Sequence, residues 1–208
     1  MNGGHKVNSV QGLFDDAQDL YSNFVVNGDN SADVIIADLK ETIKELRMYW
    51  KGDDPYLQIN DVITVTNGLI VLRNALGKLA QSAGEVANEY REIQISNGAK
   101  LGQLGKILSS DLAKENAVDV ERAGGIDIDP KAAMARNRLV KIQAKLDAFV
   151  NGVKSKVNSI EENWQEGLGR EQAKEAFESF YQAYNSTYKP SLERVVSHIE
   201  TALRNYNM

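Results

Sequence analysis

The sequence lacks cysteine altogether and has only 3 prolines and 2 histidines among its 208 residues. Without cysteine, disulfide bonds and thiol chemistry are excluded. The histidines, His5 and His198, form no His-x-x-x-His or Glu-x-x-His pair, the spacings at which a helix presents metal ligands. We therefore expect no metal site and no bound cofactor.

Long apolar runs and a basic net charge are also missing. No run approaches the roughly 18 apolar residues that cross a bilayer, so we expect no membrane span. Met1 to His5 lacks the basic region and apolar core of a secretory signal peptide. The net charge of −5 gives a nucleic-acid role no general electrostatic support, so we expect no nucleic-acid partner.

What the sequence does contain is helical periodicity. Residues 31–50 carry apolar side chains at steps of three and four, which predicts an amphipathic helix capped by Asn30 or Ser31. This stripe consists of Ile35, Leu39, Ile43, Leu46 and Trp50. The pattern stops after Trp50, and Pro55 then predicts a new helix, because proline is favoured at the first helical position.

The strongest pattern lies in the segment that follows. Apolar residues alternate steps of three and four without a break, as in the a and d positions of a helix that supercoils with a partner. They are Val62, Val65, Leu69, Leu72, Leu76, Leu79, Ala83, Val86, Tyr90 and Ile93. The predicted helix runs from about Pro55 to Gln94, or roughly 60 Å. Its apolar stripe requires another helix to pack against.

The second half of the chain shows the same order of signals. Asp129 and Pro130 predict a helix start, and the helix runs to about Trp164. Its apolar face consists of Leu139, Ile142, Leu146, Phe149, Val153, Val157 and Ile160. After a break at 164–169, the face of the last helix consists of Phe177, Phe180, Tyr184, Tyr188, Leu192, Val195, Ile199 and Leu203. Pro190 lies inside that helix and predicts a kink over 185–190.

Two segments lie outside these long helices. Residues 96–130 contain several glycines and are weakly amphipathic, so we expect a long connection with one short helix at 103–114. Residues 1–30 carry a short amphipathic stripe, which predicts either a helix docked on the others or a recognition arm. The expected division of the chain is therefore 1–30, 31–95, 96–130 and 131–208.

The approaches to the two tryptophans match at every apolar position. Counted back from Trp50 and Trp164, apolar residues recur at the same offsets, and a glycine follows each tryptophan within three residues. This indicates a duplicated unit of helix, Trp/Gly turn and helix, although any two amphipathic helices also match by periodicity. We expect Trp50 and Trp164 to cover the apolar ends of two helical hairpins, with Gly52 and Gly167 in the turns. Contact of the tryptophans with a partner is the alternative.

No constellation of catalytic residues stands out. Paired carboxylates at 161–162 and 53–54 flank the tryptophan turns, where solvated carboxylates act as helix caps. We expect no catalytic site and no enzyme activity. Tyr181, Tyr184 and Tyr188 recur on one helix face, which predicts core packing or, if they are exposed, an interaction patch.

The turn residues carry a family resemblance. Residues 50–52 read Trp-Lys-Gly, a literal Trp-x-Gly, and residues 164–167 look like the same turn with one residue inserted. On these turns, 31–95 and 131–208 resemble the WXG, or early-secreted-antigen-like, family of helical hairpins exported by type VII secretion systems. Members pair as dimers, so the resemblance implies an all-α fold of two tandem antiparallel hairpins that form a four-helix bundle within one chain. A short N-terminal amphipathic helix would precede this bundle.

The same resemblance implies a function. It implies secretion without a cleaved signal peptide and association with other helical proteins, among them a secretion ATPase or a second copy in a homodimer. The family's export signal is Tyr-x-x-x-Asp/Glu after the second helix. In this sequence no tyrosine after either second helix has that spacing, and only Tyr49 and Asp53, inside the first turn, match its letters. On the resemblance as a whole we expect an exported partner or carrier. The alternative is a cytoplasmic or particle-associated structural or adaptor protein, such as a phage or conjugation component.

Overall fold

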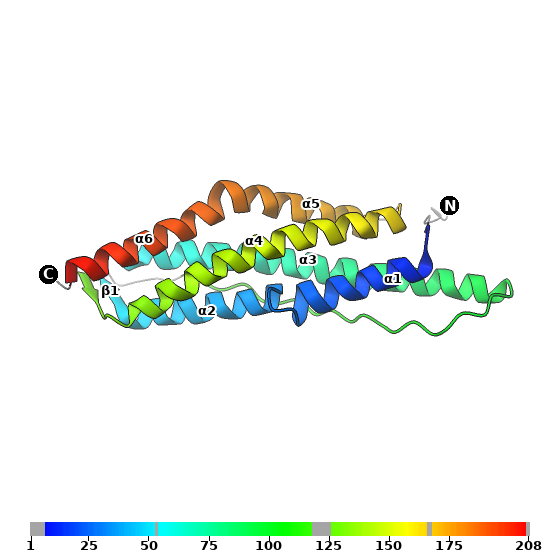
Figure 1. Ribbon diagram of the computed structural model, residues 1–208, viewed down its shortest axis with the longest axis horizontal. Coiled ribbons are helices and arrows are strands. Elements are labelled where there is room, and N and C mark those ends of the chain that lie inside the picture. Colours follow the sequence, from blue (N-terminus) through cyan, green and yellow to red (C-terminus); the bar gives the residue numbers. More distant parts are fainter. Residues whose placement is uncertain (1–6, 53, 118–125, 166–167, 207–208) are drawn as a thin grey trace.

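The structure, a computed structural model, is described for residues 7–52, 54–117, 126–165 and 168–206. Helices dominate it, which confirms the predicted all-α class (Figure 1). In chain order the elements are α1 Val10–Asp19, the π-helix η1 Leu20–Val26, α2 Ala32–Tyr49, β1 Trp50–Gly52, α3 Asp54–Ser96, β2 Ile126–Ile128, α4 Ala132–Asn163, α5 Leu168–Ala183, the π-helix η2 Tyr184–Tyr188 and α6 Lys189–Tyr206. In the described part of the chain, no helix is long and apolar enough to cross a membrane.

The helices lie side by side in one elongated body (Figure 1). α1, η1 and α2 run from one end toward the other, and α3 returns along the length of the molecule. α4 runs in the direction of α3, and α5, η2 and α6 return beside it. α3 packs against α1, α2 and α5, while α4 packs against α2 and α6. The apolar stripes of both halves of the chain therefore meet in one core.

α3 follows the heptad prediction closely. It spans Asp54–Ser96, against the predicted 55–94. The a and d positions are buried as far as Val86, Tyr90 is partly buried, and Ile93 is 55% exposed. The apolar seam of α3 is therefore covered over most of its length and becomes exposed in its last turns.

The N-terminal segment packs against the other helices. Ser9 caps α1, since its hydroxyl oxygen accepts a hydrogen bond from the Gly12 N–H at 3.0 Å. Leu13, Phe14 and Ala17 are buried, and α1 contacts α3 and α4. This helix therefore contributes to the same core as the long helices.

A π-helical segment lies where the sequence predicts a kink. At the end of η2, the Lys189 N–H donates to the carbonyl of Tyr184, five residues earlier. Pro190 follows directly and has no N–H with which to continue the hydrogen-bond ladder. The widened turn and the missing donor together account for the bend between α5 and α6 in Figure 1.

The connection after α3 differs from the prediction. The helix expected at 103–114 is absent, and residues 99–117 instead run as extended chain along α3. The prediction was wrong because side chains of α3, rather than helical hydrogen bonds, satisfy this backbone. Further on, β2 pairs antiparallel with β1, a short ribbon that the helical periodicity gave no reason to expect.

Candidate functional site

Trp50 closes the end of the molecule at which β1 lies (Figure 1). Its side chain is 1% exposed, and its extended backbone (φ −133°, ψ 115°) donates a last hydrogen bond to the carbonyl of Leu46. It pairs with Ile128 across the ribbon, and the Asp129 N–H donates to the carbonyl of Tyr49 at 2.8 Å. The chain that enters α4 therefore covers the end of α2.

Gly52 completes this turn with a φ of 114°, a conformation that residues with side chains rarely adopt. Tyr49 is partly buried, and the ammonium group of Lys131 lies 5.8 Å from the centroid of its ring. Asp53, which completes the Tyr-x-x-x-Asp match, and Gly167 of the second turn lie outside the described residues.

Trp164 closes the opposite end in the same way. It is 2% exposed and extended (φ −131°, ψ 97°), and its N–H donates to the carbonyl of Ile160 at 2.8 Å. It forms an antiparallel bridge with Val7, and the Asn8 N–H donates to the carbonyl of Asn163 at 3.0 Å. The chain that enters α1 therefore covers the end of α4.

The two ends have the same pattern of backbone pairing. At each end, the turn of one half of the chain pairs with the start of the other half. The residue before the tryptophan accepts a backbone hydrogen bond through its carbonyl. The donor is the N–H of the residue that follows the tryptophan's pairing partner, Ile128 for Trp50 and Val7 for Trp164. The matched apolar positions before each tryptophan are buried in both copies. They are Ile35, Ile36, Leu39, Ile43 and Leu46 in the first copy and Phe149, Val150, Val153, Val157 and Ile160 in the second.

The indole rings act through packing. The buried Nε1–H of Trp50 has no hydrogen-bond partner among the described residues, which costs stability. Its contribution to folding therefore comes from the apolar area of the ring. With exposures of 1% and 2%, neither Trp50 nor Trp164 presents a ring face to a partner.

Tyr184 is the most buried of the three tyrosines. Its hydroxyl donates to Oδ1 of Asp147 at 2.7 Å, and Nζ of Lys189 donates to the same carboxylate at 3.0 Å. Burial, followed by the neighbouring carboxylate, raises the pKa of Tyr184 above its usual value. Burial alone would raise the pKa of Asp147, but hydrogen bonds from Tyr184 and Lys189 lower it below its usual value. The triad joins α4 to the π-helical bend.

Tyr181 and Tyr188 lie on either side of Tyr184 and are partly buried. The ammonium group of Lys154 lies 5.3 Å from the centroid of the Tyr181 ring. The hydroxyl of Tyr188 reaches Gly68 on α3, where a Cβ would lie 2.5 Å from that oxygen. Tyr188 thus needs a glycine opposite it, and the three tyrosines do not form one exposed patch.

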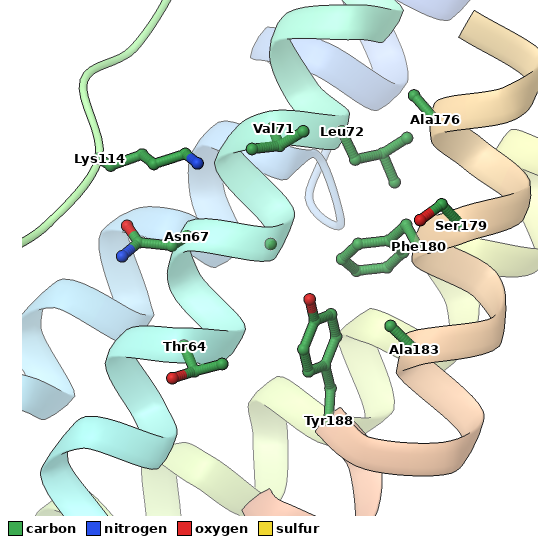
Figure 2. A pocket seen from close by; sticks show the side chains of 11 residues that line it. Thr64, Asn67, Val71, Leu72, Lys114, Ala176, Ser179, Phe180, Ala183 and Tyr188 are labelled. Carbon is green, nitrogen blue, oxygen red and sulfur yellow. The ribbon is translucent and has the colours of Figure 1, made fainter.

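A recess of about 380 Å³ opens beside Tyr188, between α3 and α5 (Figure 2). Phe180 and Tyr188 project into it from one side, and Asn67 and Lys114 lie on the other. Its lining also includes small side chains of α5, namely Ala176, Ser179 and Ala183. The residues that line the recess include no cluster of catalytic groups.

Many charged side chains among the described residues form ion pairs, and none gather into a metal site. Among the described residues, no group of three His, Asp or Glu side chains is placed to hold a metal ion. Between described residues, five ion pairs join the first half of the chain to three cations of α4. They are Arg138–Glu45 at 2.8 Å, Arg138–Asp38 at 3.9 Å, Lys145–Asp38 at 2.8 Å, Lys156–Asp16 at 3.1 Å and Lys156–Asp19 at 2.8 Å.

Comparison with known proteins adds no relative to this description. No protein-family model, no curated protein and no solved structure matches the chain.

Proposed function

We propose that this chain is a non-catalytic helical protein of the type VII secretion class, which acts by helix-mediated association as an exported partner or carrier. In this proposal, α1 to α3 form one helical hairpin and α4 to α6 a second. The two hairpins close into a four-helix bundle within one chain. η2 is a bend between α5 and α6, whereas non-helical residues 27–31 separate η1 from α2.

The reciprocal closure of the two tryptophan ends carries the proposal. In a two-fold symmetric dimer, a contact between surface i of one subunit and surface j of the other occurs twice, with the subunits exchanged. Here the start of the first half pairs with the turn of the second, and the start of the second half pairs with the turn of the first. That is the contact pattern of a hairpin dimer joined into one chain, and it favours duplication over chance periodicity.

The outer helix faces are the surfaces that remain for association. Both tryptophans and nearly all of the heptad seam are buried within the chain. The recess between α3 and α5 offers a partly apolar pocket of the kind that receives an anchoring side chain from a partner (Figure 2).

Export is the property that tests this proposal. We expect the protein to accumulate in the culture medium of a producing strain only when the secretion ATPase of its type VII system is intact. Immunoblots of medium and cells, from strains with active and inactive ATPase, measure this. A cytoplasmic enzyme measured in the same samples controls for lysis.

Strict retention in cells or in particles, with the ATPase active, would contradict export. It would support the alternative, a structural or adaptor protein that uses the same bundle. Release that does not depend on the ATPase would exclude the type VII class while leaving helix-mediated association in place.

A further inference from the structure

α3 holds the extended segment 101–115, here called the strap, through a ladder of side-chain amides. Asn67, Asn74, Gln81 and Asn88 are spaced seven residues apart on α3, so they share one face of the helix. Their partners are the main-chain groups of Glu115, Leu112, Ser109 and Gly105, in that order. The strap therefore runs antiparallel to α3.

Two of the amides bind the main chain in both directions. Nδ2 of Asn67 donates to the carbonyl of Glu115 at 2.9 Å, and Oδ1 accepts from its N–H at 2.7 Å. Asn74 does the same with Leu112, at 3.0 Å and 2.9 Å. Each carboxamide thus replaces a neighbouring β-strand, which would offer the same donor and acceptor. These hydrogen bonds involve main-chain groups of the strap, so they do not depend on its side chains.

The spacing of the ladder matches the repeat of an extended chain. Seven residues of α-helix advance about 10.5 Å, and three residues of extended chain advance about 10 Å. The bound residues Ser109, Leu112 and Glu115 are three apart. Gly105, the partner of Asn88, lies four residues before Ser109, so the match in spacing holds for Asn67, Asn74 and Gln81. These three amides can therefore bind an extended peptide without loss of register.

Glycines on α3 form the floor beneath the strap. A Cβ on Gly77 would lie 2.1 Å from Oγ of Ser109, and one on Gly84 would lie 3.2 Å from Cδ1 of Ile107. Ile107 is buried, whereas Leu108 between them is 71% exposed. The floor therefore selects a small residue at 109 and accepts an apolar residue at 107.

Basic groups flank the same face. The guanidinium of Arg73, itself 3% exposed, donates to the carbonyl of Ser110. Nζ of Lys78 lies 2.8 Å from a carboxylate oxygen of Asp111. An acidic residue two positions after the small residue therefore lies beside a cation. The strap has an apolar residue at 107, a small residue at 109 and an acidic residue at 111, and so satisfies all three preferences.

We propose that this face of α3 is a binding site for extended peptides, occupied here by the chain's own strap. Its ligand class is an extended segment of another protein with an apolar residue, a small residue two positions later and an acidic residue two positions after that. Such a segment binds by displacing the strap. Among the described residues, the hydrogen bonds that hold the main chain of 101–115 come from α3 side chains and not from a neighbouring strand, so a second peptide can make the same set.

The test compares two full-length double variants. In I107D/S109L, the inward-facing positions receive a charge and a bulky group, which the glycine floor excludes. In the matched control L108D/S110L, the same residues are placed at exposed positions. Amide hydrogen exchange at 109, 112 and 115 should accelerate in the first variant and stay as in the parent chain in the second.

Fluorescence anisotropy of a labelled peptide of residues 100–117 then measures its binding to the α3 face that the strap leaves free in I107D/S109L. We expect it to bind I107D/S109L at least about tenfold more tightly than the control, in which the tethered strap competes at high effective concentration. Adding Asn74→Ala and Gln81→Ala should abolish this gain, and a peptide with leucine in place of Ser109 should not bind. Equal binding to both double variants, or binding that survives loss of the amides, overturns the proposal.

The unmodified chain supplies a second measurement that does not depend on a variant folding. Peptide at a concentration above the effective concentration of the tethered strap should accelerate amide exchange of the strap at 109, 112 and 115. Exchange that is unchanged at that peptide concentration overturns the proposal. Sedimentation of the unmodified chain as dimers with exchanged straps would make a second copy the ligand and overturn the assignment to another protein. None of these outcomes depends on export.

Discussion

Each tryptophan is the last buried side chain of a helix that continues into extended backbone. Trp50 and Trp164 both donate their backbone N–H four residues back, to Leu46 and Ile160 respectively. The ring then covers the apolar end of the helix pair, while the backbone beyond it pairs with an incoming segment. Removing the ring leaves a cavity that the paired backbone keeps from collapsing.

We therefore expect Trp50→Ala and Trp164→Ala each to lower the free energy of unfolding by about 3–5 kcal/mol, the usual cost of truncating a buried tryptophan. Urea unfolding followed by circular dichroism measures this without relying on tryptophan fluorescence. Met48→Ala is the control, because Met48 is 54% exposed on the same helix and should change stability by less than about 0.5 kcal/mol. Losses below about 1 kcal/mol in both tryptophan variants would mean that the rings are not structural.

Tyr184 predicts a specific dependence of stability on alkaline pH. Its folded pKa is raised above the unfolded value of about 10, so its stabilising contribution is complete below pH 10 and is lost as pH rises toward the folded pKa. Tyr184→Phe should abolish this part of the alkaline loss and should cost about 1.5 kcal/mol at neutral pH, from the bond to Asp147.

Unfolding midpoints measured from pH 8 to pH 11 test this expectation. Asp147→Asn removes the neighbouring charge but keeps Tyr184 buried, so it should reduce the alkaline loss without abolishing it. Equal losses in the parent chain and in Tyr184→Phe above pH 10 would contradict the assignment.

At the scale of elements, apolar periodicity predicts the helices that pack through an apolar stripe. It does not predict segments whose backbone is bound by side chains of another element. The ends of α2 and α3 were predicted within a few residues, because caps, proline and the apolar stripe agree there. The kink before Pro190 was predicted from the chemistry of proline alone. Its form, a π-helical turn over Tyr184–Tyr188, was not predicted.

The extended segment after α3 shows the limit of this approach. Its glycines and weak amphipathicity were interpreted as a connection with one short helix, although 99–117 contains none. The missing signal lies in another element, in amides seven residues apart from Asn67 to Asn88 on the polar side of the heptads. An analysis that considers only apolar positions does not detect these amides. β1 and β2 were missed for a similar reason, since pairing between distant residues leaves no local period.

The candidate site was predicted in part. The sequence places Trp50, Gly52 and Trp164 in turns, and the structure has them at the helix ends with buried rings and a positive φ at Gly52. It does not reveal that Val7 and Ile128 complete those ends. Only the tertiary structure brings these residues together, because each lies more than thirty residues from its tryptophan in the sequence.

At the scale of the whole molecule, the seams that would pair two hairpin proteins are filled within one chain. Apolar stripes of the first half pack against those of the second through α2 with α4 and α3 with α5. Ion pairs such as Lys145–Asp38 bridge the same boundary. Among the described residues, the large apolar side chains left exposed come from four elements, α2, α3, α4 and the strap.

A second copy would thus find no unfilled seam, so we expect a monomer of 23.0 kDa. Sedimentation equilibrium over a wide range of concentrations measures this mass directly. A dimer that persists on dilution would require an interface above about 1,000 Å². If twice the monomer mass were found, either the straps or the two halves of the chain would be exchanged between molecules. Exchange of the halves predicts that mutating Trp50 alters the mass as well as the stability, because its pairing with Ile128 would then join two molecules.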